Sequence, residues 1–185
     1  TVTQSQVTPP STSPAQKMDL QEGDAFFPYL YLSDAFPRVT DEAQAKKDIE
    51  KFSKVIANSS GDVIGAYNNR AVLYLETGRS DLAFADLDKA LSLKPDNAIL
   101  LSNQGYAFMN AGRLNEALAA YNRSLEIEPK NIYALSNRAM LYQNTGQFGP
   151  ALIDLNAAIE VDPKQAVVIN NRGMLYHTMG NLSLS

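Results

Sequence analysis

Four asparagines at a constant spacing are the most distinctive polar residues of this sequence. Asn69, Asn103, Asn137 and Asn171 follow one another at equal intervals, in the similar stretches NNRAVLY, SNQGYAF, SNRAMLY and NNRGMLY. A carboxamide carries both a hydrogen-bond donor and an acceptor, so it can pair with a peptide group of any sequence. The chemistry that these residues offer is therefore hydrogen bonding, and polypeptide backbone is a fitting ligand.

The groups that would make or break covalent bonds are missing from the sequence. His177 is the only histidine, cysteine does not occur, and the glycines form no phosphate-binding pattern. No base stands beside a nucleophile, and a lone histidine without a cysteine partner is a poor candidate for a metal site. We therefore expect a protein that is not an enzyme and that carries no cofactor and no metal.

Composition excludes two further classes of partner. The chain has 185 residues, 45% of them hydrophobic, which is enough to bury a core. Acidic residues outnumber basic ones by 20 to 16, and no basic run is longer than Lys46 and Lys47, so we expect no nucleic acid binding. No apolar run approaches the roughly 20 residues that span a bilayer, so we expect no membrane span.

After Asp62 the chain repeats itself with a constant period. A glycine recurs at 78, 112, 146 and 180, and a proline at 95, 129 and 163. Small and large apolar residues recur on both sides of each glycine; in the first copy they are Tyr67, Ala71, Tyr74, Ala83, Leu87 and Ala90. The pattern predicts a helix, a glycine turn, a second helix and a proline that ends it. We expect whole repeats over 64–97, 98–131 and 132–165, and the first helix of a partial repeat in 166–185.

This pattern resembles the tetratricopeptide repeat, in three copies that share one register. The resemblance implies an all-α fold, a right-handed α-solenoid of helix-turn-helix repeats, in which each repeat buries its apolar face by stacking on its neighbours. It also implies that the first helix of each repeat lines a concave groove, while the second helix faces outward.

The resemblance places the four asparagines in that groove. In some members of the family, asparagines at this position hydrogen-bond an extended peptide; the alternative is that they only bridge neighbouring helices. Three residues further along each first helix lies an apolar line that would select side chains; it consists of Val72, Tyr106, Met140 and Met174.

Some family members grip a carboxylate with lysines and arginines in the groove. The matching positions here are Asn68, Val72, Asn103, Tyr133 and Asn137, which include no cation. An acidic peptide tail is therefore not the expected ligand.

Arginine and aspartate appear together in two of the repeats. Arg70 and Arg138 are each followed 16 residues later by an aspartate, Asp86 and Asp154, whereas the second repeat has Gln104 and Ala120. A partly buried charge needs its counter-charge, so we expect an ion pair inside each of the two repeats and no ligand-binding role for these arginines.

Residues 1–39 form an irregular N-terminal extension. Residues 1–24 are rich in Thr, Ser, Gln and Pro, and such a composition does not offset the entropy of ordering. Residues 25–39 carry large apolar side chains that either cover the end of the first repeat or dock on another protein; the docking candidates are Phe26, Phe27, Tyr29, Tyr31 and Phe36. A helix follows in 40–61, which we interpret as a degenerate repeat.

The expected function is that of a scaffold that binds a partner protein or an extended peptide, as an assembly or recruiting factor in a larger complex. The alternatives are a fixed structural subunit with an empty groove, and a regulatory domain of a longer protein. Because the chain begins with Thr1, we expect a processed chain or a fragment. The Thr/Ser/Pro-rich start favours an exported or organelle-imported chain, with the cytoplasm as the alternative.

Overall fold

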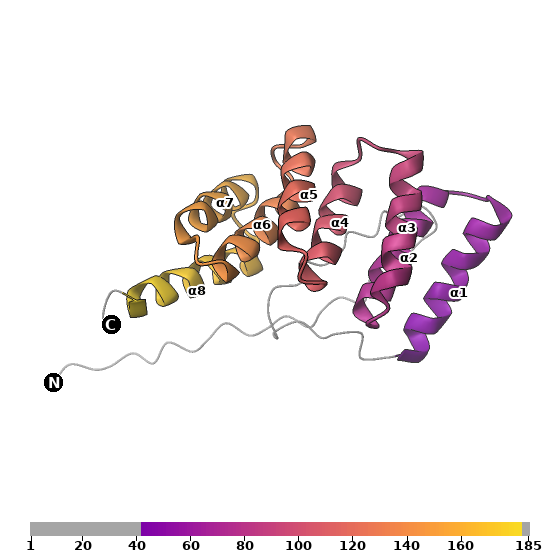
Figure 1. The fold of residues 1–185 in the computed structure, drawn as a ribbon, viewed down its shortest axis with the longest axis horizontal. Helices are drawn as coiled ribbons and strands as arrows, with labels where there is room; N and C mark the ends of the chain where they lie inside the picture. Colours follow the sequence, from indigo (N-terminus) through magenta and orange to yellow (C-terminus); the bar gives the residue numbers. More distant parts are fainter. Residues whose placement is uncertain (1–41, 183–185) are drawn as a thin grey trace.

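The computed structural model describes residues 42–182, which form helices joined by short turns (Figure 1). This part of the chain contains no strand. The helices are α1 (Glu42–Asn58), α2 (Val63–Glu76), α3 (Ser80–Leu93), α4 (Ala98–Asn110), α5 (Leu114–Ile127), α6 (Ile132–Asn144), α7 (Phe148–Val161) and α8 (Ala166–Leu182). The predicted all-α solenoid of helix-turn-helix repeats is confirmed.

A glycine turn joins the two helices of each complete repeat. Gly78, Gly112 and Gly146 adopt φ values of 74°, 73° and 75°, in the left-handed region that glycine enters without a steric penalty. The backbone N–H of Arg79 donates to the carbonyl of Tyr74 at 2.7 Å, which closes the end of α2, and α4 and α6 end in the same way. The predicted turns at these three glycines are confirmed.

The fourth glycine behaves differently, and the turn predicted at Gly180 is wrong. Helix α8 continues through Gly180 to Leu182. In the complete repeats, a second helix packs back onto the first and stabilises the reversal of the chain. Gly180 instead keeps helical backbone and does not adopt the left-handed conformation of the other three glycines.

Proline and asparagine mark the boundaries between repeats. Helices α3, α5 and α7 each end two residues before a proline, which cannot continue a helix. The side chain of Asn97 then caps α4 by accepting from the N–H groups of Ile99 and Leu100, and Asn131 caps α6 through the N–H of Ala134. The chain therefore reverses direction at regular intervals.

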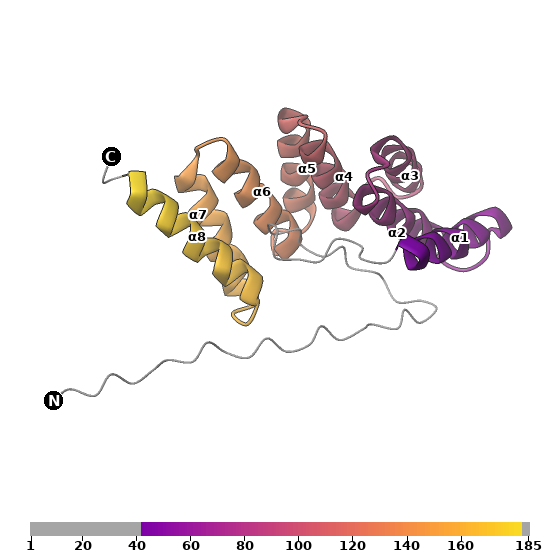
Figure 2. The same cartoon turned by 90° about the horizontal axis from the view of Figure 1, so that it is seen from below.

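The helices form two rows along the solenoid. Each helix packs on the next, and the first helices α2, α4 and α6 also contact one another directly. Figure 2 shows the elongated stack that results. Because the first helices lie closest together, they form the inner row, and the second helices α3, α5 and α7 lie outside it.

Small residues permit the close approach of the two helices within each repeat. Gly105 on α4 lies against Tyr121 on α5, which is completely buried. A Cβ atom added at Gly105 would lie 2.6 Å from Cε1 of the Tyr121 ring. The equivalent residues Ala71 and Ala139 are buried against Leu87 and Leu155, which are smaller than tyrosine.

Helix α1 packs on α2 at the start of the solenoid and buries Ala45, Ile49 and Phe52. The helix predicted in 40–61 is confirmed over Glu42–Asn58. Its origin as a degenerate repeat stays a prediction.

The crossing at Gly105 generates a stability prediction with an internal control. Gly105→Ala should destabilise the fold by about 1–3 kcal/mol, because the added Cβ would force the completely buried Tyr121 ring or the two helices to shift. Gly173 holds the equivalent position in the interior of α8 with no atom within 4 Å of an added Cβ, so Gly173→Ala should stabilise the fold by up to about 1 kcal/mol. Urea unfolding of both variants measures the contrast, and equal effects would contradict the assigned crossing.

Candidate functional site

The four repeated asparagines lie on the inner row and are all buried, with 3–6% of their surface exposed. Asn103 Nδ2 on α4 donates to Asn68 Oδ1 on α2 at 2.6 Å, and Asn68 Nδ2 donates to Asn69 Oδ1 at 3.3 Å. At this junction the amides bridge neighbouring helices, which is the alternative role. The structure therefore assigns Asn103 first to the stability of the stack.

The next junction along the inner row lacks this bridge. Ser102 and Ser136 hold, on α4 and α6, the place that Asn68 holds on α2, and a hydroxymethyl group is shorter than a carboxamide. Ser102 Oγ, Ser136 Oγ and Asn137 Oδ1 are buried and have no hydrogen-bond partner within the described residues. Buried polar atoms without partners are uncommon, so the inner row retains hydrogen-bonding capacity at Ser102 and Asn137 between α4 and α6, and at Ser136 on α6.

The apolar line becomes more accessible toward the C-terminal end of the solenoid. Val72 on α2 is buried, Tyr106 and Met140 are half-buried, and Met174 on α8 is exposed. The part of the line that a ligand can reach therefore lies over α4, α6 and α8. The binding roles predicted for these residues and for the four asparagines remain predictions.

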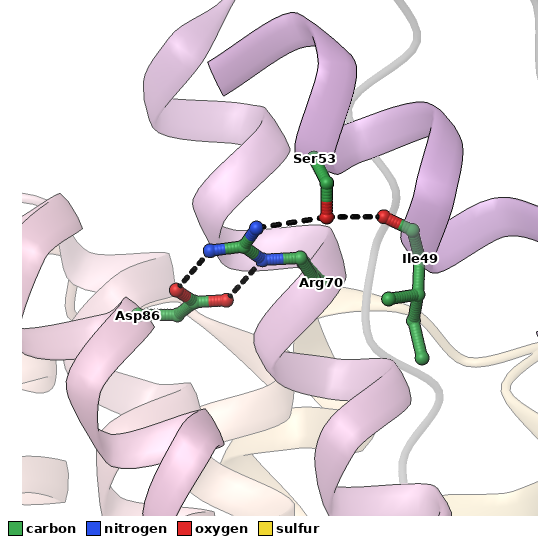
Figure 3. Close-up of polar contacts among 4 residues, drawn as sticks. All are labelled: Ile49, Ser53, Arg70 and Asp86. Carbon is green, nitrogen blue, oxygen red and sulfur yellow. Dashed lines mark hydrogen bonds and ion pairs between the residues drawn. The ribbon is translucent and has the colours of Figure 1, made fainter. Parts of the chain in front are cut away.

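Arg70 is held on both sides of α2, as Figure 3 shows. Its Nε and Nη2 atoms donate to the two carboxylate oxygens of Asp86 on α3, both at 2.7 Å. Its Nη1 atom donates to Ser53 Oγ on α1 at 2.9 Å, and that hydroxyl donates to the carbonyl of Ile49 at 2.7 Å. One side chain thus connects three successive helices.

Arg138 repeats the same arrangement on α6. Nε and Nη2 donate to the carboxylate of Asp154 on α7 at 2.8 and 2.7 Å, and Nη1 donates to Asn122 Oδ1 on α5 at 2.6 Å. The hydrogen bonds to Asp154 raise the pKa of Arg138 against the opposing effect of burial. Both predicted ion pairs, Arg70 with Asp86 and Arg138 with Asp154, are confirmed.

The contact of each arginine with the preceding helix was not anticipated from the sequence. Asn122 precedes Arg138 by 16 residues, and Asn156 precedes Arg172 by the same interval; Arg172 Nη1 donates to Asn156 Oδ1 at 2.9 Å. Gln104 likewise donates to Asp88 Oδ1 at 3.0 Å, again 16 residues earlier. The backward spacing of 16 was the signal that could have revealed these partners.

These pairs determine the charge of the inner row. The α4 sequence has no charged residue, and the cations of α2 and α6 are Arg70 and Arg138. Both guanidinium groups point toward second helices and are neutralised there. The first three inner helices therefore present apolar and amide groups, without a cation that is free to bind a carboxylate.

The sequence also led to predictions about an N-terminal docking segment, metal sites and membrane spans. The docking candidates Phe26, Phe27, Tyr29, Tyr31 and Phe36 lie outside the described residues. Within residues 42–182, no group of three or more His, Asp or Glu side chains is arranged to hold a metal ion. No helix in this range has the length and apolar character needed to cross a membrane.

Comparison with known families identifies the class of protein. Two family models, both described as tetratricopeptide repeat, match residues 66–132 and 104–169, which together make up more than half of the chain. The chain belongs to the tetratricopeptide repeat family, whose members are generally non-enzymatic protein-interaction modules. No curated protein matches the chain in sequence.

Solved structures with the same fold share little sequence with this chain. The first TPR domain of the human RPAP3 protein has a TM-score of 0.61 and 17% identity, covering 66% of this chain and 96% of that one. The first TPR of Spaghetti (RPAP3) bound to the HSP90 peptide SRMEEVD has a TM-score of 0.58 and 17% identity, covering 63% and 93%. The protein TTC0263 from Thermus thermophilus has a TM-score of 0.65 and 20% identity, covering 72% and 73%.

The ion pairs generate a prediction for which the second repeat supplies the control. Asp154→Asn should destabilise the fold by about 3 kcal/mol, because Arg138 keeps its charge in a largely buried place without a counter-charge. The double variant Arg138→Gln with Asp154→Ala reproduces the Gln104 and Ala120 arrangement and should recover more than half of that loss. Urea unfolding measures both free energies. A double variant as unstable as Asp154→Asn would show that the charge is not the cause.

Proposed function

We propose that this chain is a non-enzymatic adaptor that binds an extended, weakly charged segment of a partner protein along α4, α6 and α8. The observation that carries the proposal is the internal pairing of Arg70 and Arg138 with Asp86 and Asp154. Burial of a charged ligand group without a counter-charge is costly, so the lack of a free cation on α2, α4 and α6 favours a ligand without acidic groups over these helices.

Two further features support the ligand's position. Tyr106, Met140 and Met174 form the accessible part of the apolar line, and their side chains suit apolar residues of an extended segment. Asn137 lies on α6 about one turn before Met140, and its Oδ1 atom has no donor within the described residues. A rotation of the Asn137 side chain would offer a carboxamide to the backbone of the ligand, because an amide pairs with any peptide group.

The proposed ligand differs from the peptide in one of the similar structures. The Spaghetti domain is bound to SRMEEVD, which contains three acidic residues. The inner row of this chain has no free cation on α2, α4 or α6 to match such a peptide. We therefore infer that the shared fold carries a different specificity here, and that the partner's segment is recognised by apolar side chains and backbone.

Selection from a phage-displayed library of 12-residue peptides tests this function. The full chain should enrich peptides with apolar and aromatic residues and few charges. Asn137→Ala should weaken a selected peptide by a factor of roughly two to ten, the effect of one net hydrogen bond. The double variant Arg138→Gln with Asp154→Ala should bind as the natural chain does, because the pair does not face the ligand.

The control for Asn137→Ala is Asn115→Ala, since Asn115 is exposed on the outer helix α5. Enrichment of acidic peptides whose binding depends on Arg138 would contradict the proposal. Loss of binding in Asn115→Ala to the same extent as in Asn137→Ala would also contradict it.

A further inference from the structure

Within the described part of the chain, Arg172 lacks the aspartate partner that Arg70 and Arg138 have at the equivalent positions of their repeats. Arg70 and Arg138 each make two hydrogen bonds to an aspartate on the following helix and one to the preceding helix. Arg172 on α8 occupies the equivalent position and makes the contact with the preceding helix, to Asn156 Oδ1 at 2.9 Å. Within residues 42–182 this is its single hydrogen bond, so the part of the guanidinium that meets a carboxylate elsewhere is unpaired.

Three residues close to Arg172 on α8 are exposed, whereas their equivalents in the complete repeats are covered by a second helix. Gly173 is exposed and has no atom within 4 Å of an added Cβ. At the equivalent Gly105, the Tyr121 ring occupies the space that a Cβ would take. Ile169 and Tyr176 are 42% and 52% exposed. We refer to Ile169, Arg172, Gly173 and Tyr176 as the α8 face; its counterparts on α2, α4 and α6 are each covered by the second helix of the repeat.

We propose that the α8 face docks an amphipathic helix of a partner protein in which a carboxylate immediately precedes a bulky apolar or aromatic residue. The internal repeats supply the template. Helices α3 and α7, which cover α2 and α6, both read Ala-x-x-Asp-Leu-x-x-Ala; their residues are Ala83, Asp86, Leu87 and Ala90, and Ala151, Asp154, Leu155 and Ala158.

The complementarity can be specified residue by residue. The carboxylate of the partner helix would pair with Arg172 as Asp154 pairs with Arg138. The next residue would lie over Gly173, where the absence of a Cβ admits a side chain as large as tyrosine, as at Gly105. Small residues three positions to either side would let the helices approach. The proposal rests on this arrangement and does not depend on the ligand proposed for the inner row.

A second copy of this chain is a poorer occupant of the α8 face. The Asp-Leu helices α3 and α7 are already engaged with α2 and α6 in each copy. Helix α1, at the opposite end of the solenoid, exposes more basic than acidic residues; they are Lys46, Lys47, Lys51 and Lys54 against Glu42 and Glu50. A basic helix is repelled by Arg172, so charge complementarity favours an acidic helix from a different protein.

The probe is a helix-stapled peptide of residues 113–128 carrying Ala120→Asp, which places a carboxylate directly before Tyr121. The peptide with the natural Ala120 is its matched control. Fluorescence anisotropy with the full chain should show the aspartate peptide binding roughly tenfold more tightly than the alanine peptide, as a charge-assisted pair allows. Added salt should reduce that preference.

Two variants of the full chain complete the test. Arg172→Gln should remove the difference between the two peptides, while glutamine keeps the contact with Asn156 in the way that Gln104 contacts Asp88. Gly173→Leu should abolish the binding of both peptides. Thermal unfolding of Gly173→Leu should show a midpoint no lower than that of the natural chain, because an added Cβ meets no atom there and leucine favours the helix more than glycine does.

Several outcomes would overturn the proposal. These are equal affinities of the two peptides, or an aspartate preference that survives in Arg172→Gln. Self-association of the chain in sedimentation experiments, abolished by Gly173→Leu, would assign the α8 face to a second copy. Tighter peptide binding by the full-length double variant Tyr29→Ser with Tyr31→Ser would assign it to the chain's own N-terminal segment. Asn137→Ala should leave peptide binding unchanged, which separates this site from the inner row.

Discussion

The stack depends on a side chain near the middle of α2, and another near the middle of α6, each of which connects three successive helices. In α2 and α6 this side chain is an arginine, which bonds the helix before it and the helix after it. Its planar guanidinium group has enough donors to bond both neighbours at once, which a lysine cannot do with the same geometry. Apolar stacking supplies most of the burial, and in these two repeats the arginine fixes how the repeat is oriented on the helix that precedes it.

The same arginine arrangement determines which groups the surface presents to other molecules. Where the arrangement is complete, the arginine is paired with an aspartate inside the repeat, and the inner row presents apolar and amide groups. Where it is incomplete, on α8, a cation remains beside an open glycine and exposed apolar residues. One structural feature thus accounts for two surfaces of opposite character, one suited to a weakly charged extended segment and the other to an acidic helix.

The regular period of the sequence made most of the fold predictable, because glycine turns, prolines and small residues each impose a local geometry. The ion pairs were also predictable, since charge is present or absent as a pair. The bridge from Asn103 to Asn68 could not be separated from a ligand role, because an amide suits both. The helical state of Gly180 could not be foreseen, because glycine is compatible with both helical and left-handed backbone.

Arg70 and Arg138 are bonded to carboxylates inside the solenoid, whereas Arg172 has no such bond within residues 42–182. Nuclear magnetic resonance of the arginine Nε–H groups measures this directly, through their rates of hydrogen exchange with water. We expect slow exchange for Arg70 and Arg138, whose Nε–H groups bond carboxylates, and fast exchange for Arg172. Exchange at Arg138 as fast as at Arg172 would show that Arg138 is not held by Asp154. It would then also contradict the conclusion that the inner row has no free cation on α6.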